Sequence, residues 1–325
     1  MGGDGIDLYS GAEQFRHLVK FRNSVQTPMS GPRRIVIIGS GGRLGAALAR
    51  EWRAAGDDVI GFNHALLDIG DFRQVHETLG DLDFDALVNC AAQTNVDRCE
   101  KEPDEAFHLN SQAVATLADV CTRKKARCIH ISTDYVFDGE KREPYTEEDE
   151  ARPISVYGES KLGGERCLHA VSDSHLAVRV SWVFGPDRAS FVDQILQRAL
   201  DHEIVEAIGD KVAVPTYTLD AARLLRPLLD EVPLDGVVHL CNAGACSWQE
   251  YGQHALDCAL AADVPLKGRI VGALKMADLK AFIARRPVYT AMSTARLQRT
   301  TGLTPRPWQE AVDEYIRTHW APRHR

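Results

Sequence analysis

The stretch Arg34-Ile-Val-Ile-Ile-Gly-Ser-Gly-Gly-Arg-Leu-Gly45 decides the fold of this chain. Its continuous apolar run is typical of a parallel strand that is buried on both faces. In the GxxGxxG turn that follows, Gly39 permits a tight turn, Gly42 lets a phosphate approach the backbone, and Gly45 lets helix and strand pack closely. A helix predicted over 43–55 then offers free N–H groups to an anion. The stretch therefore predicts a dinucleotide site at the start of an α/β domain.

Strands and helices continue to alternate downstream of this turn. Further apolar strands are predicted at 58–62, 85–89, 127–131, 176–180 and 236–240. One long helix is expected over 103–125, between the third and fourth strands. This alternation predicts an α/β fold with a Rossmann-type doubly wound parallel sheet.

The pattern divides the chain into an arm, a sheet domain and a smaller lobe. Before residue 33 there is no clear period, and beyond Trp182 the alternation loosens into helices and loops punctuated by proline. We therefore predict an N-terminal arm (1–32), an NAD(P)-binding Rossmann domain (33–184 and 204–243) and an interleaved C-terminal substrate-binding lobe (185–203 and 244–325).

Composition excludes several classes of function. The formal net charge is -8 and no long Lys/Arg run occurs, so we expect no nucleic-acid partner. No apolar run approaches the ~20 residues that span a bilayer, and no signal peptide is visible, so we expect a cytoplasmic protein without a membrane partner. The eight cysteines are scattered singly without a CxxC pair, which predicts free thiols and no metal site. A requirement for Mg²⁺ is left open.

Two further motifs carry chemistry. Thr133 lies at the carboxyl end of the fourth predicted strand, where an open α/β sheet places its ligands, although a Ser/Thr turn is the ordinary reading of such a residue. Tyr157 and Lys161 are four residues apart and therefore share a helical face. A nearby ammonium is expected to lower the pKa of the phenol from ~10 and to make it a proton donor near neutral pH. Each motif alone is common, but their order after the glycine turn favours a single hydride-transfer site.

These segments together resemble one known family. The chain is similar to the dTDP-4-dehydrorhamnose reductase family of extended short-chain dehydrogenases/reductases over about residues 33–318. The segments that carry the resemblance are GSGGRLG, NCAAQTNVDRCE, STDYVFDG, PISVYGESKLGGE, RVSWVFG, VPT and ARRP.

The resemblance implies a role for individual residues. Thr133 would bind the substrate carbonyl, Tyr157 would supply its proton, and Lys161 would hold the nicotinamide ribose; Asn110 would support the site. The expected cofactor-binding residues are Gly39, Gly42, Arg43, Leu44, Gly45, Asn63, Asp68, Ile69, Cys90, Ala91, Ala92, Tyr157 and Lys161. The expected substrate-binding residues are Thr94, Val96, Asp134, Tyr135, Trp182 and Arg286, the last as a diphosphate contact.

The implied activity is NADPH-dependent reduction of a nucleotide-linked 4-keto-6-deoxy sugar, as in dTDP-L-rhamnose biosynthesis. Phe62-Asn63-His64, at the end of the second strand, contains no carboxylate that would select NAD(H), so NADP(H) is favoured and NAD(H) remains an alternative. A sugar dehydratase of this type carries an Asp-Glu pair after the catalytic Thr, whereas Asp134-Tyr135 follows it here. The expected partners are the sugar nucleotide and a second copy in a homodimer.

Two departures concern the substrate half. Asp210-Lys211 replaces the family's usual Asp-Gln before the VPT segment, and Val288-Tyr-Thr-Ala follows ARRP in place of an Asn-Ser pattern. They leave the identity of the sugar open. An alternative reading is a non-catalytic NADP-binding regulatory subunit, similar to the methionine adenosyltransferase β subunit, and an epimerase is a third.

Overall fold

The computed structural model describes residues 32–230, 234–279 and 281–324. Residues 33–325 cluster into one compact unit. Apart from Pro32, the predicted N-terminal arm lies outside the described residues.

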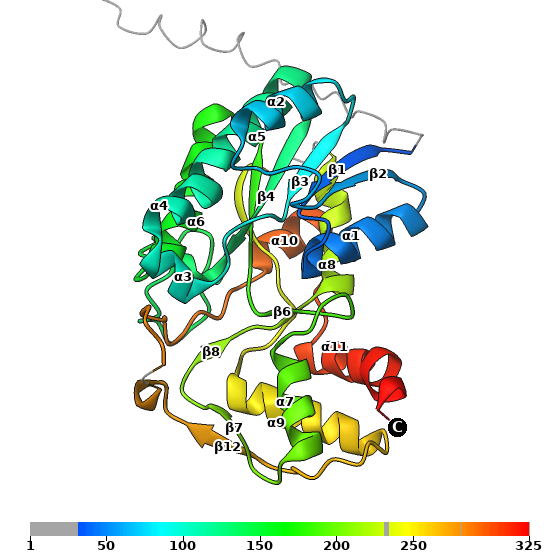
Figure 1. The fold of residues 1–325 in the computed structure, drawn as a ribbon, viewed down its shortest axis with the longest axis vertical. Helices are drawn as coiled ribbons and strands as arrows, with labels where there is room; N and C mark the ends of the chain where they lie inside the picture. Colours follow the sequence, from blue (N-terminus) through cyan, green and yellow to red (C-terminus); the bar gives the residue numbers. More distant parts are fainter. Residues whose placement is uncertain (1–31, 231–233, 280, 325) are drawn as a thin grey trace, which may run out of the picture. The chain divides into compact units, whose positions relative to one another are not determined.

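A six-stranded parallel sheet forms the centre of this unit, in the order β10-β5-β4-β3-β1-β2 (Figure 1). Its strands are β1 (Arg34–Ile38), β2 (Asp58–Phe62), β3 (Ala86–Asn89), β4 (Arg127–Thr133), β5 (Leu176–Val180) and β10 (Gly236–His239). The predicted doubly wound fold is confirmed. The strand order reverses between β1 and β3, and such a reversal is where open α/β sheets bind ligands.

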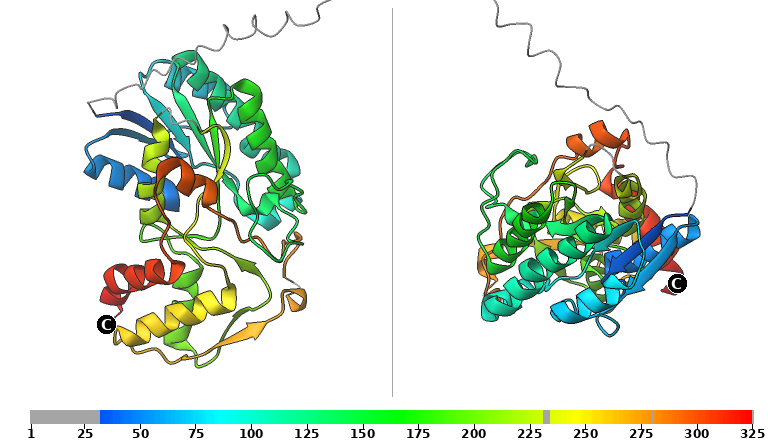
Figure 2. Two further views of the ribbon diagram at one scale, coloured as in Figure 1. Left: turned by 180° about the vertical axis from the view of Figure 1, so that it is seen from behind. Right: turned by 90° about the horizontal axis from the view of Figure 1, so that it is seen from above.

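Helices cover both faces of the sheet, as Figures 1 and 2 show. Helices α1 (Arg43–Ala54) and α8 (Thr218–Leu225) pack together on one face, over a core that includes Trp52 and Val178. Helices α2 (Phe72–Gly80), α5 (Ala113–Lys124) and α6 (Val156–Val171) cover the other, over a core that includes Val75 and Leu117.

The helix predicted over 103–125 is interrupted. After the short helix α3 (Val96–Lys101), the chain forms α4 (Pro103–Phe107), a π-helical turn (His108–Gln112) and then α5. Asn110, in the π turn, donates to Gln93 O and to Ser160 Oγ, both at 3.0 Å, and accepts from Gln93 N at 2.8 Å. These tertiary bonds bring the turn against α6, and a wider turn of this kind often marks a functional site.

A second core lies beyond the sheet and includes Val192, Leu256 and Trp308. Three helices lie around it: α7 (Phe191–Asp201), α9 (Trp248–Ala261) and α11 (Trp308–Tyr315). Three short strand pairs complete this region: β6 (Val183–Phe184) pairs with β9 (Thr216–Tyr217), β7 (Val205–Ile208) with β12 (Val271–Leu274), and β8 (Val212–Ala213) with β11 (Cys246–Ser247). Strand β7 therefore pairs outside the parallel sheet, whereas α10 (Ala295–Thr301) packs beside β10.

Candidate functional site

The glycine turn joins β1 to α1 as the sequence predicts. Gly39 has φ +79°, in the left-handed region that favours glycine, and a Cβ there would lie 2.8 Å from Ala91 N. A Cβ on Gly45 would collide with Gly39 O. Helix α1 starts after Gly42 without a side-chain cap, so its first N–H groups are free to bind an anion. The turn thus fits a dinucleotide phosphate.

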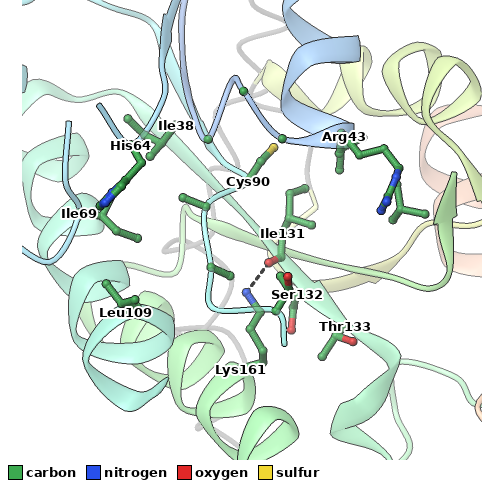
Figure 3. Close-up of a pocket in the computed structure, with 18 of the residues that line it drawn as sticks. Ile38, Arg43, His64, Ile69, Cys90, Leu109, Ile131, Ser132, Thr133 and Lys161 are labelled. Carbon is green, nitrogen blue, oxygen red and sulfur yellow. Dashed lines mark hydrogen bonds between the residues drawn. The ribbon is translucent and has the colours of Figure 1, made fainter. Parts of the chain in front are cut away.

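A cavity of ≈ 1570 Å³ opens beside this turn, along the carboxyl ends of the central strands (Figure 3). Among the predicted site residues, it is lined by Gly39, Gly42, Arg43, Leu44, Asn63, Asp68, Ile69, Cys90, Ala91, Ala92, Thr94, Val96, Thr133, Asp134, Tyr135, Tyr157, Lys161 and Trp182. Gly45 and Arg286 do not line it. The fold therefore brings together nearly all of the residues that the sequence nominated.

The end of β4 and the turn after it place three consecutive side chains at the cavity, those of Thr133, Asp134 and Tyr135. Thr133 caps a short 3-10 turn by accepting from Tyr135 N at 3.2 Å, and its hydroxyl also donates to Asp134 Oδ1 at 3.2 Å. Thr290 donates to the other oxygen of Asp134 at 2.5 Å. Burial raises the pKa of Asp134, and the ammonium of Lys211 opposes that shift. The single carboxylate after Thr133 is therefore already held by two hydroxyls.

Tyr157 lies in the first turn of α6, which Ser155 caps by accepting from Gly158 N at 3.3 Å. Burial raises the pKa of Tyr157 above its usual value, although a hydrogen bond with Thr133 lowers it in part. The pKa therefore moves opposite to the sequence-based prediction, because burial of the phenol outweighs its neighbours. A phenol protonated at neutral pH is the state needed to donate a proton.

Lys161 lies one turn further along α6 and is 2% exposed. Its Nζ donates to Ile131 O at 2.6 Å and lies 3.0 Å from Nε2 of His130 (Figure 3 shows the former bond). Burial lowers the pKa of Lys161 to about 8, with Glu165 and Cys90 opposing the shift. The ammonium is thus aimed at the main chain of β4, which explains why it does not reverse the effect of burial on Tyr157.

Arg286 is engaged elsewhere. Its guanidinium forms a two-pronged ion pair with Asp97, at 3.0 and 2.9 Å, and stacks 3.7 Å from the centroid of Phe282. This pairing lowers the pKa of Asp97 to about 2. The guanidinium of Arg286 thus already has a carboxylate partner. Its expected contact with a diphosphate stays a prediction.

The residues expected at the adenosine end lie at the edge of the cavity. Asn63 accepts from Ala65 N and Leu66 N, and Asp68 accepts from Gly70 N. The side chain of His64 is 86% exposed beside them. Arg43 donates to the backbone oxygens of Arg188 and Ala189, which ties α1 to the segment after β6.

Sequence reasoning missed several residues that the structure places at the site. Ser132, Ser181 and Arg188 line the cavity, while His130 and Lys211 lie buried behind it. Two of them carry a signal in the sequence: His130 is a titratable residue inside an apolar strand, and Lys211 replaces an expected Gln. In the described residues no cluster of His, Cys, Asp or Glu could hold a metal ion, and no helix there is long and apolar enough to cross a membrane.

Comparison with known proteins adds independent findings. A family model described as the RmlD substrate binding domain matches residues 33–320. The spore coat polysaccharide biosynthesis protein SpsK of Bacillus subtilis is 34% identical over 285 residues, which cover 87% of this chain and 96% of that protein. A dTDP-4-dehydrorhamnose reductase of Mycolicibacterium smegmatis is 36% identical over 286 residues, covering 87% and 85%.

Solved structures agree with these relatives. The crystal structure of a dTDP-4-dehydrorhamnose reductase from Bacillus anthracis in complex with NADP superimposes with a TM-score of 0.81 at 29% identity. The match covers 87% of this chain and 98% of that one.

Proposed function

This chain belongs to the dTDP-4-dehydrorhamnose reductase family of extended short-chain dehydrogenases/reductases, and from that premise we propose that it reduces a nucleotide-linked 4-keto-6-deoxy sugar with NADPH. The observation that carries the proposal is that Thr133, Tyr157 and Lys161 line one cavity with the glycine turn. The reductase relatives, which match nearly the full length of the chain, support the same reading.

The side chains suit the chemistry of carbonyl reduction. NADPH supplies the hydride when it is bound. Tyr157, which burial keeps protonated, donates its proton to the oxygen of the forming alkoxide, and Thr133 hydrogen-bonds that oxygen. Lys161 would hold the nicotinamide ribose through the donor that Ile131 leaves free.

NADP(H) is the proposed cofactor rather than NAD(H). Directly after β2, where NAD-selective sites carry an Asp or Glu, the cavity wall has Asn63 and His64 instead, and its nearest carboxylates, Asp68 and Asp71, follow further along the chain. We expect kcat/KM with NADPH to equal or exceed that with NADH. A preference for NADH of more than about tenfold, or ~1.4 kcal/mol, would contradict this assignment.

The sugar nucleotide is proposed to lie between the sheet and the second core. Trp182 lines the cavity from a left-handed backbone conformation (φ +40°) and packs on Trp248 and Tyr251 of α9. We propose that the sheet domain holds the cofactor and that the region around the second core holds the sugar nucleotide. Because β7 pairs with β12, we move 204–208 from the predicted sheet domain to the lobe, and because α10 packs on β10, we move 295–301 to the sheet domain.

Simple reduction is favoured over elimination or epimerisation. A dehydratase or epimerase needs a second base near the sugar ring, and the carboxylate of Asp134 is held by Thr133 and Thr290. A regulatory subunit would not need Tyr157 hydrogen-bonded to Thr133 in the cavity beside the glycine turn.

The test is product analysis with dTDP-4-keto-L-rhamnose and NADPH in deuterated water. We expect a single reduced sugar, one NADPH oxidised per product, and no enzyme-dependent deuterium at C3 or C5. Deuterium at those carbons would indicate epimerase chemistry. Absence of product from any sugar nucleotide, with NADPH still bound, would favour the regulatory alternative.

A further inference from the structure

Three buried side chains form a chain of hydrogen bonds behind the cavity. Asn89 ends β3, His130 lies within β4 and Lys161 projects from α6. Asn89 and His130 are 0% exposed and Lys161 is 2% exposed. None of the roles assigned above uses Asn89 or His130.

The direction of these bonds is set from the Asn89 end. The backbone N–H of Ala91 can only donate, and it donates to Asn89 Oδ1 at 3.0 Å. The amide nitrogen of Asn89 therefore faces His130, with Nδ2 3.1 Å from Nδ1, and an amide nitrogen also can only donate. Nδ1 of His130 must accept, so the single proton of the neutral ring lies on Nε2.

The opposite nitrogen of the ring faces Lys161. Nε2 lies 3.0 Å from Nζ, and Nζ also donates to Ile131 O at 2.6 Å. An ammonium has three donors and no acceptor, so a charged Lys161 would set one of its donors against the N–H of His130. A neutral amine has a lone pair, which can accept that N–H.

We propose that His130 is a positioning residue for Lys161: fixed by Asn89 as the Nε2–H tautomer, it donates a hydrogen bond to Nζ when Lys161 is a neutral amine, and its N–H disfavours the ammonium. The ring is held in place by α6, since a Cβ on Gly164 would lie only 3.2 Å from Nε2. The proposal concerns the side chains of this protein alone and does not depend on the identity of the sugar.

The groups around His130 and Lys161 affect the charge of both side chains. Burial lowers the pKa of His130 well below 6.5, and Lys161 and His169 lower it further, so the ring is neutral. Around Lys161, Glu165 on α6 and Cys90 after β3 favour the ammonium. Glu165 is neutralised by Arg179, at 2.9 and 2.7 Å, and burial raises the pKa of the Cys90 thiol to about 12. Burial therefore outweighs Glu165 and Cys90 and lowers the pKa of Lys161 to about 8.

The consequence is a cofactor site that loses a positive charge just above neutral pH. Lys161 is charged below about pH 8 and becomes neutral as the pH rises through that value. The affinity for an anionic dinucleotide should then weaken above pH 8, by up to about tenfold per pH unit. This consequence rests on the proposed function, whereas the tautomer does not.

The tautomer can be measured directly. Long-range ¹H–¹⁵N spectra of protein labelled with ¹⁵N-histidine, with His130 assigned by His130→Gln, should show Nε2 protonated and Nδ1 unprotonated from pH 6 to 9. A proton on Nδ1 in the wild-type protein would overturn the proposal. This readout needs no cofactor, no substrate and no stable Asn89 variant.

Asn89→Asp reverses the bond. A carboxylate can accept from His130 but cannot donate to it, so a proton should appear on Nδ1 and the titration midpoint of Lys161 should rise by at least about one pH unit. The midpoint is read from the ¹³Cε shift of Lys161, assigned by Lys161→Met. An unchanged midpoint in folded Asn89→Asp protein would contradict the proposal.

Asn95→Asp is the matched control. Asn95 is exposed and caps α3 by accepting from Arg98 N, a role that Asp also performs. It introduces the same charge and should change neither His130 nor Lys161. NADPH binding, followed by fluorescence from pH 7 to 9.5, tests the cofactor site separately from the His130 tautomer. If NADPH does not bind while His130 has its proton on Nε2, the cofactor assignment is wrong and the proposed tautomer is still supported.

Discussion

Burial dominates the protonation states of single residues in this site. It raises the pKa of Tyr157 and lowers the pKa of Lys161, so both groups move toward their neutral forms. Desolvation penalises whichever form is charged, which explains the opposite signs. A protonated phenol beside a lysine that titrates near neutrality suits a proton donor.

Tyr157→Phe isolates the proton donor. We expect kcat to fall by ~10²–10⁴, the usual worth of a general acid, while the dissociation constant of NADPH stays nearly unchanged. Steady-state kinetics and NADPH fluorescence titration measure the two effects. Tyr289→Phe, a partly buried tyrosine that does not line the cavity, serves as the control. Wild-type turnover in Tyr157→Phe would remove this residue from the mechanism.

Lys211 is a second buried cation and yields a prediction on stability. It is 0% exposed, donates to Pro287 O at 2.5 Å and lies 4.8 Å from the centroid of the Tyr135 ring. Burial lowers its pKa from 10.5 to about 8. Below pH 8 the folded and unfolded states are both protonated, and the full cost of the buried charge is present. Between about pH 8 and 10.5 only the unfolded state stays protonated, so the wild-type protein gains stability relative to a variant without the charge.

Lys211→Met should therefore show its most favourable change in unfolding free energy near pH 7. Relative to the wild type, that difference should shrink as the pH rises, by up to roughly 3 kcal/mol over the window. Urea unfolding of both proteins at pH 7.0 and 9.5 measures it. The exposed Lys101→Met should show no such trend, and a pH-independent difference for Lys211→Met would argue against a depressed pKa.

At the scale of elements, helix α6 carries both Tyr157 and Lys161 and is fixed to the sheet by buried polar bonds. Glu165 accepts two bonds from Arg179 of β5 and one from Ser132 of β4. Gly158 and Gly164 allow close approach, because a Cβ at either would collide with a backbone oxygen. The positions of Tyr157 and Lys161 thus depend on how α6 packs against β4 and β5.

Breaking the α6–β5 pair should destabilise the protein. In Arg179→Met the carboxylate of Glu165 stays buried without its cation, and the expected loss is ~3–5 kcal/mol of unfolding free energy. The double variant Arg179→Met/Glu165→Gln should recover much of this loss, since no unpaired charge remains. Denaturant unfolding measures both. A single variant as stable as the wild type would mean that the pair does not hold α6.

At the scale of the whole molecule, the site combines the parallel sheet with segments that follow it in sequence. The cavity is lined by the ends of β1 and β4, by the segment that follows β3, and also by Trp182 and Arg188. Arg43 of α1 bonds the backbone at Arg188 and Ala189. A ligand in this cavity therefore contacts both parts, and its binding should stabilise the complete unit of residues 33–325.

NADPH should raise the melting temperature of the protein in proportion to the logarithm of its concentration. Binding to the folded state alone contributes about 2.7 kcal/mol at a concentration 100 times the dissociation constant. Scanning calorimetry with NADPH, and with NADH at equal concentration, checks the effect and the cofactor preference together. An unchanged melting temperature at saturating NADPH would contradict the proposed cofactor site.

Removing Met1–Thr27 should leave folding and reductase activity intact. The segment precedes the first strand and has little apolar periodicity, so few buried contacts should be lost. Melting temperature and kcat of the truncated protein test this. A large fall in melting temperature would show that the arm packs on the domain. Loss of binding to a protein partner, with folding and activity unchanged, would favour the regulatory alternative.

Local patterns in the sequence were enough to determine the sheet and the positions of the main site residues. An apolar run, three glycines at fixed spacing and an i,i+4 pair depend on the backbone period of a single segment, so β1, α1 and the shared face of Tyr157 and Lys161 could be read directly. The cavity lining agrees with most of the residues nominated in this way.

Only the tertiary structure decided which partner each polar group has. The π turn at Asn110, the Arg286–Asp97 pair and the chain from Asn89 to Lys161 all join segments far apart in sequence. The direction of the Tyr157 pKa shift likewise depends on how completely other segments exclude water from the phenol. Periodicity reports which face of an element is buried, but the electrostatic state of a side chain depends on what buries it.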